Sequence, residues 1–130
     1  MQYVLLLSHA PEAWQQPEAA QPAEWAAYTL ALQEAGVLLA GSALHGTDTA
    51  TTVQVREGRQ LVTDGPFAET KEHLLGYYLI DVADLDDALA WAARVPSVRT
   101  GSVEVRPVVP GSDVATVLAT TGARAGAASG

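Results

Sequence analysis

Two apolar runs of strand length frame the chain. The first extends from Tyr3 to Leu7 without a polar residue, and the second extends from Leu74 to Val82, interrupted by Gly76 and Asp81. A strand that is buried on both faces has such a continuous pattern, whereas a half-exposed strand alternates. The pattern therefore predicts two central strands of one sheet.

Helical spacing follows each of these strands. Trp25, Tyr28 and Leu32 are three and four residues apart within residues 24–35, which predicts an amphipathic helix. Asp84 is suited to cap a second helix, because its carboxylate can accept a hydrogen bond from an N–H of the first turn. Residues 37–44 and 101–109 have the composition of two further strands.

A β-hairpin is predicted between the strand at residues 37–44 and the apolar run that starts at Leu74. Residues 49–56 and 59–63 are rich in Thr and Val, and they flank the short turn Glu57-Gly58. We expect this hairpin at an edge of the sheet, with one of its faces exposed to solvent.

The order strand, helix, strand, hairpin, strand, helix, strand predicts an α+β fold. Right-handed crossovers place both helices on the same face of a ferredoxin-like split βαβ sandwich, to which the hairpin is added. The two central strands are apolar on both faces, and the helices then cover only one of these faces. A homodimer with its sheets face to face would bury that surface.

Composition narrows the class of protein. The 130 residues predict one domain over 1–109, followed by an Ala/Gly/Thr-rich tail over 110–130 that we expect to be mobile or loosely docked. A net charge of -8 argues against nucleic acid and anionic membranes as partners. Cysteine is absent, which excludes thiolate nucleophiles. The N-terminus lacks a basic leader and a membrane-length apolar run, so we expect a cytoplasmic protein.

Candidate chemistry gathers at the turn 63–72, where Gly65-Pro66 forces the backbone to change direction. Asp64 is a candidate proton carrier there, or it locks the turn with its own carboxylate. Glu69 and Lys71 share a face if the segment is extended, so they would hold a polar ligand or pair with each other.

Further candidates lie on or beside the strands. Glu104 and Arg106 alternate with valines, and Arg106 would bind a carboxylate or phenolate, or pair with Glu104 or Glu69. His9 and His73 are candidate proton shuttles or surface donors. Tyr77 would line a pocket if it faces the barrel interior. No close metal-ligand spacing, phosphate loop or dinucleotide fingerprint occurs, so no cofactor is predicted.

Three motifs resemble the YCII-related family, in its branch named for an Asp-Gly-Pro-Phe motif. They are Asp64-Gly65-Pro66-Phe67 with its flanks from Thr63 to Glu72, then Gly76-Tyr77-Tyr78-Leu79-Ile80, then Glu104-Val105-Arg106-Pro107. The resemblance implies a dimeric α+β barrel. It also implies kinship with cofactor-independent enzymes of small, often aromatic metabolites, and a His/Asp pair in which Asp64 is the aspartate.

The resulting hypothesis is a homodimer that binds a small polar or aromatic metabolite in the barrel interior. A cofactor-independent elimination, isomerisation or cyclisation is the reaction class, with Asp64 and His9 or His73 moving the proton, and Arg106, Lys71 and Glu69 orienting an anionic substrate. The alternative is a non-enzymatic ligand-sensing or protein-interaction module, since relatives of this branch occur near sigma factors.

Overall fold

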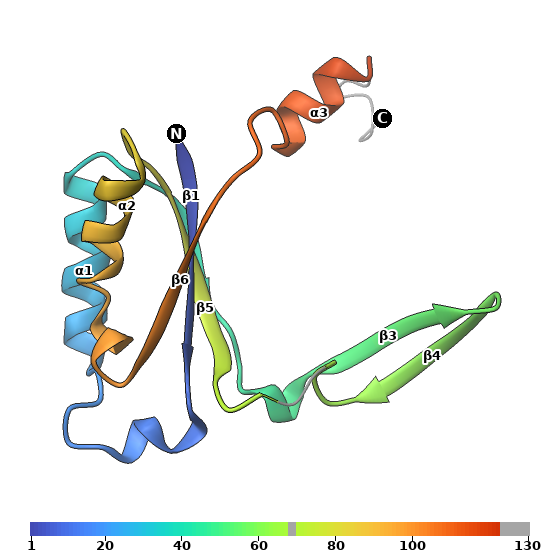
Figure 1. The fold of residues 1–130 in the computed structure, drawn as a ribbon, viewed down its shortest axis with the longest axis horizontal. Helices are drawn as coiled ribbons and strands as arrows, with labels where there is room; N and C mark the ends of the chain where they lie inside the picture. The colour runs from blue at the N-terminus through green and yellow to red at the C-terminus, as the bar shows by residue number, and fades with distance from the viewer. Residues whose placement is uncertain (68–69, 123–130) are drawn as a thin grey trace.

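The computed structural model describes residues 1–67 and 70–122, which form a four-stranded sheet with helices on one face and two projecting elements (Figure 1). The sheet has the order β2–β5–β1–β6, and every neighbouring pair is antiparallel. Its strands are β1 (Gln2–His9), β2 (Leu38–Ala43), β5 (His73–Asp81) and β6 (Gly101–Pro107). The helices α1 (Pro22–Glu34) and α2 (Leu85–Ala92) are the two crossovers. This order confirms the predicted ferredoxin-like α+β fold.

The core lies between the sheet and the helices. In β1 the odd-numbered residues are buried, and Leu5 pairs with Tyr78 on one side and Val105 on the other. Tyr28 and Leu32 are the buried residues of α1, in agreement with the predicted spacing. Each large apolar side chain buried here contributes about 1.5–3 kcal/mol to the free energy of unfolding.

Polar contacts fix the helices. The Tyr28 hydroxyl donates to the carbonyl oxygen of Trp91 at 2.8 Å and so joins α1 to α2. Burial raises the pKa of the Tyr28 hydroxyl. At the start of α1 the Gln21 N–H donates to the Glu24 carboxylate at 2.7 Å, as part of a capping box. As predicted, Asp84 caps α2 by accepting from the Asp87 N–H at 2.9 Å.

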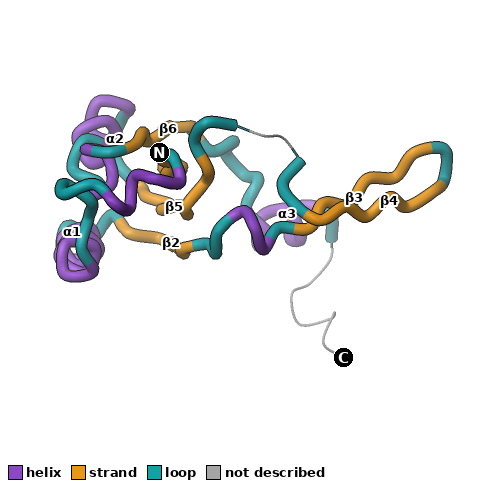
Figure 2. The backbone as a smooth tube through the Cα atoms, turned by 90° about the horizontal axis from the view of Figure 1, so that it is seen from below, coloured by secondary structure: helices purple, strands orange, loops and turns teal. Residues whose placement is uncertain are grey.

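No helix of residues 1–67 and 70–122 covers the opposite face of the sheet, which we call the open face. Figure 2 shows α1 and α2 on the same side of the strands. Val4, Leu6, Tyr77 and Leu79 alternate with the core residues and are half-buried on the open face. The prediction that helices cover one face only is therefore confirmed.

The hairpin forms, but not at the predicted place. Strands β3 (Thr51–Arg56) and β4 (Arg59–Asp64) make a separate two-stranded sheet that projects from the body, so the expected position at an edge of the main sheet is wrong (Figure 1). The short helix η2 (Thr47–Thr49) carries the chain away from β2, and Gly65, with a φ of 103°, turns it back.

The tail contains a helix, α3 (Val114–Thr120), which the tail composition did not predict. Asp113 is its N-cap and accepts from the Thr116 N–H at 3.1 Å, which gives the helix a defined start. Residues 123–130 of the predicted tail lie outside the described residues. Among the helices of the described residues, none is long and apolar enough to cross a membrane.

Candidate functional site

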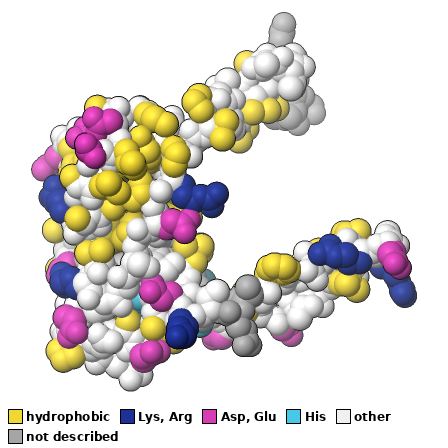
Figure 3. Space-filling view, in the orientation of Figure 1, with side chains coloured by type: hydrophobic (Ala, Val, Ile, Leu, Met, Phe, Trp, Pro, Cys, Tyr) yellow, Lys and Arg dark blue, Asp and Glu magenta, His cyan; other side chains and the backbone are white. Residues whose placement is uncertain are grey.

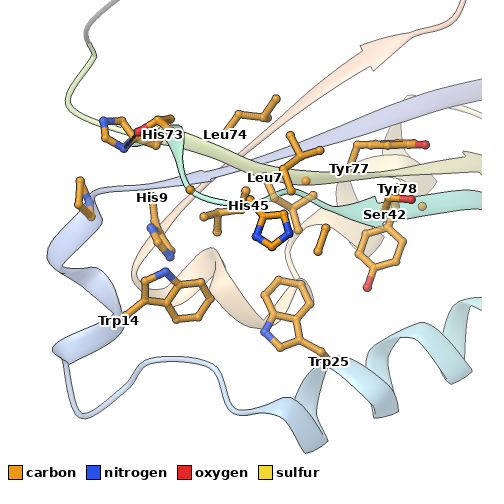
Figure 4. Close-up of a pocket in the computed structure, with 18 of the residues that line it drawn as sticks. Leu7, His9, Trp14, Trp25, Ser42, His45, His73, Leu74, Tyr77 and Tyr78 are labelled. Carbon is orange, nitrogen blue, oxygen red and sulfur yellow. Dashed lines mark hydrogen bonds between the residues drawn. The ribbon is translucent and has the colours of Figure 1, made fainter. Parts of the chain in front are cut away.

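A cleft of about 630 Å³ lies on the helix side of the sheet (Figure 4). It is formed by the end of β1, the short helix η1 (Pro11–Gln15), the start of α1, the end of β2 with the loop after it, and the start of β5. The lining residues are Leu7, His9, Pro11, Trp14, Trp25, Gly41, Ser42, Ala43, Leu44, His45, Gly46, Thr47, Asp48, His73, Leu74, Leu75, Gly76, Tyr77 and Tyr78.

Two indoles form one wall of the cleft. Pro11 stands at the start of η1, where a proline favours a helical turn, and the buried Ala13 anchors the turn to the body. The chain thereby folds back beneath the end of β1 and brings Trp14 to His9, with 4.4 Å between ring centroids and 83° between ring planes. Trp25, in the first turns of α1, lies beside Trp14 along the same wall (Figure 4).

His9 is the most unusual side chain of the cleft. It is 2% exposed, yet neither ring nitrogen has a hydrogen-bond partner within residues 1–67 and 70–122. Leaving a buried polar group unpaired costs about 1–3 kcal/mol, so such groups are rare in native proteins. His9 therefore has donor and acceptor capacity that the described part of the chain does not use.

Two more histidines line the same cleft. His73 is the cross-strand partner of His9, and its Nδ1 lies 3.0 Å from the Thr47 hydroxyl. His45 follows β2 and lies between His9 and Tyr78 in Figure 4. Within the described residues, no three His, Asp or Glu side chains are grouped closely enough to hold a metal ion.

Small residues and few charges define the rest of the cleft. Gly41, Ala43 and Gly76 add little or no side chain to the cleft, and a Cβ at Gly76 would collide with the Ser42 carbonyl oxygen. Apart from the histidines, Asp48 is the one acidic residue among the lining residues. No Lys or Arg of the described ranges lines the cleft. The lining therefore suits a flat, uncharged ligand that exchanges hydrogen bonds with imidazole.

The residues predicted at the turn lie elsewhere. Asp64 ends β4, is exposed and is not a lining residue of the cleft. The turn is held instead by the Gly65 N–H, which donates to the Ala50 carbonyl oxygen at 2.7 Å, and by the Thr52 hydroxyl, which donates to the Gly65 carbonyl oxygen at 2.7 Å. Lys71 is exposed, and Glu69 lies outside the described residues.

Three other predicted residues lie on the open face. Leu6 pairs with Tyr77 on β5 and with Glu104 on β6, so the side chains of Tyr77 and Glu104 lie on the same face as the side chain of Leu6. Arg106 Nε is 3.8 Å from Glu104 Oε2, and both side chains are largely exposed. An exposed pair of this kind contributes little to stability. The structure thus places His9 and His73 together, and separates them by the sheet from Glu104 and Arg106.

Sequence reasoning did not select Trp14, Trp25 or His45 as site residues. A signal was present: Trp14 follows His9 by five residues, with Pro11 between them to turn the chain. An aromatic residue placed so soon after a strand-end histidine can return to cover it.

Comparison with known proteins gives the family context. A family model for the YCII-related domain matches residues 1–112. An uncharacterised protein of Rhizobium meliloti (strain 1021) is 51% identical over 77 residues, which are 58% of this chain and 62% of that protein. The match therefore spans less than two thirds of the relative's own length.

Proposed function

The chain belongs to the YCII-related domain family, and from that premise we propose that it binds a small aromatic metabolite in the cleft beside His9 and catalyses a cofactor-independent acid/base step there. We propose further that it acts in the cytoplasm as a homodimer. Elimination, isomerisation and cyclisation are the reaction classes that need only such a proton transfer.

The burial of His9 without a partner is the observation that carries this proposal. A neutral imidazole presents one N–H donor and one nitrogen acceptor. A ligand hydroxyl or carbonyl beside His9 would satisfy a group that is otherwise buried at a cost. The position of His9 on the wall of an aromatic cleft gives the ligand both a flat surface and a proton-transfer group.

The roles of the other lining residues follow from their chemistry. Trp14 and Trp25 offer indole faces on which an aromatic ring can stack, and Trp14 also packs edge-on against His9. His73, with its Nδ1 beside the Thr47 hydroxyl, is positioned to orient a second polar group of the ligand. His9 would accept a proton from the substrate and return it at another atom, so that no external redox partner is needed.

The homodimer rests on the open face. Val4, Leu6, Tyr77 and Leu79 form an apolar row that the two helices leave uncovered. Packing two such rows against each other would bury both, at the spacing of about 10 Å usual for stacked sheets. The predicted barrel and its interior would arise from this packing.

Binding of phenol, followed through tryptophan fluorescence, tests the proposal. We expect His9→Leu to raise the Kd for phenol by about tenfold or more, because it removes a buried hydrogen bond. Leu79→Met is the control, since Leu79 lies on the open face and is not a lining residue of the cleft, and it should leave the Kd unchanged. Equal affinities for the wild type and His9→Leu would contradict the site.

A deuterium-exchange assay tests the proton-transfer step separately from binding. In D₂O, a general base in the cleft should speed deuterium uptake at the methyl group of acetophenone, and His9→Leu should abolish that gain. Phenol binding without any such exchange would favour the second candidate, a non-enzymatic sensing or interaction module. That candidate is supported by the exposed apolar side chains of the hairpin and α3.

A further inference from the structure

Two elements leave the body of the molecule on the side of the open face. The β3–β4 hairpin projects from one end of the sheet and α3 from the other, so that the open face lies between them (Figure 1). Figure 3 shows both elements standing clear of the body, with hydrophobic side chains along each of them.

The hairpin has one apolar face. Val53 pairs with Val62, and Val55 pairs with Gln60, so the three valines point to the same side. Their exposed fractions are 57%, 60% and 59% for Val53, Val55 and Val62. The other face carries the pairs Gln54 with Leu61 and Arg56 with Arg59. The ribbon is therefore amphipathic, although none of its valines is covered by the body.

The short helix α3 repeats this arrangement. Val114, Val117 and Leu118 are three and four residues apart and fall on one side of the helix. Val114 and Val117 are exposed, and Leu118 is half-buried. An isolated hairpin and an isolated helix of this length are both marginal in water, so each needs a surface to cover its apolar side.

We infer that the β3–β4 hairpin and α3 are clasps that lie against a second copy of this chain docked on the open face. The inference rests on the homodimer proposed above and adds the elements that hold it together. Each copy would grip its partner with two elements, whose apolar faces are buried only in the dimer.

The reach of the hairpin fits a second copy. Six residues per strand at about 3.3 Å each give an arm of about 20 Å, whereas stacked sheets lie about 10 Å apart. The arm is therefore long enough to pass the partner's sheet and contact its flank.

The charges of the open face also fit a second copy. Glu104 and Arg106 lie side by side on β6 with opposite signs. A twofold axis can bring each of them to the opposite charge of the other copy, which makes the face complementary to itself. One partner, a second copy of the chain, would thus cover both the apolar row of the open face and the apolar sides of the two clasps.

Sedimentation of the full-length chain over a range of concentrations tests the inference. The hairpin variant Val53→Thr/Val55→Thr/Val62→Thr keeps β-branched side chains, so the hairpin itself should persist. We expect this variant, and separately Val114→Thr/Val117→Thr, to raise the dimer Kd by about tenfold or more. Leu61→Thr, on the opposite face of the same hairpin, is the control and should leave the Kd unchanged.

The outcomes separate the clasps from the dimer itself. If Leu79→Thr on the open face weakens a dimer that the hairpin and α3 variants leave intact, the dimer stands and the clasps are overturned. A control that weakens the dimer as much as the valine variant overturns the assignment of faces. A wild type that is monomeric at every concentration overturns both clasps and homodimer, and phenol binding at His9 is then judged by its own titration.

Discussion

The indole of Trp14 stands edge-on to the imidazole of His9, with ring centroids 4.4 Å apart and ring planes at 83°. Trp14 itself is half exposed, whereas His9 is buried. Trp14 of the short helix η1 therefore contributes to the cover of His9, in addition to the strands around it.

Replacing Trp14 should uncover His9. We expect Trp14→Ala to speed the modification of His9 by diethylpyrocarbonate, followed by mass spectrometry of the His9 peptide. The loss of the aromatic contact should lower the free energy of unfolding by only about 1 kcal/mol. Trp25→Ala is the control, because Trp25 lines the cleft without forming a ring pair with His9. An unchanged rate in Trp14→Ala would show that other groups cover His9.

The floor of the cleft predicts a strong dependence on Gly76. A Cβ at this position would collide with the Ser42 carbonyl oxygen and press on the Ala43 Cα, both of which belong to the backbone of β2. We expect Gly76→Ala to destabilise the fold by about 2 kcal/mol, measured by urea unfolding. Gly46→Ala should cost less, since its nearest neighbour is the Asp48 side chain, which can rotate away.

Much of the fold followed from pattern. The continuous apolar run from Tyr3 to Leu7 marked β1, and the spacing of Trp25, Tyr28 and Leu32 marked α1, because core packing leaves a periodic trace in sequence. The position of the hairpin left no such trace. The sequence pattern of its strands is the same whether they join the main sheet or project from it. The η2 turn that directs the hairpin away from the main sheet is only three residues long.

The site was less predictable than the fold. His9 and His73 were selected for their chemistry, and they become cross-strand neighbours where β1 and β5 pair beyond an irregularity between Leu7 and Ser8. Asp64 was selected with them, but the projecting hairpin carries it to a separate sheet. Trp14 becomes part of the site only through the path of the η1 segment, which is a tertiary feature that local spacing suggests but does not determine.

Acid should loosen α3. Hydrogen bonds from the Thr116 hydroxyl and N–H lower the pKa of the Asp113 carboxyl below its ordinary value. The capped helix therefore prefers the carboxylate, so the cap acts fully above the ordinary aspartate range and is lost as the pH falls through the lowered pKa. We expect NMR shifts of residues 114–120 to lose helical character between about pH 5 and about pH 2. Asp113→Asn, which caps without titrating, should show no such pH dependence.

The contact between α1 and α2 should be sensitive to one hydroxyl. Tyr28→Phe removes the donor to the Trp91 carbonyl oxygen and leaves that oxygen without this partner. We expect a loss of about 1 kcal/mol in the free energy of unfolding, measured by chemical denaturation. Tyr77→Phe on the open face forms the comparison and should change stability less. Equal effects would mean that the Tyr28 hydrogen bond adds no net stability.

The position of a bound phenol tests the central claim most directly. In a crystal structure with 4-bromophenol, the anomalous signal of bromine locates the ring independently of its surroundings. We predict a bromine peak in the cleft walled by Trp14 and Trp25, with the phenol oxygen within hydrogen-bond distance of a His9 ring nitrogen. A peak on the open face beside Leu79 and Arg106, with the cleft unoccupied, would contradict the assignment of the site to His9.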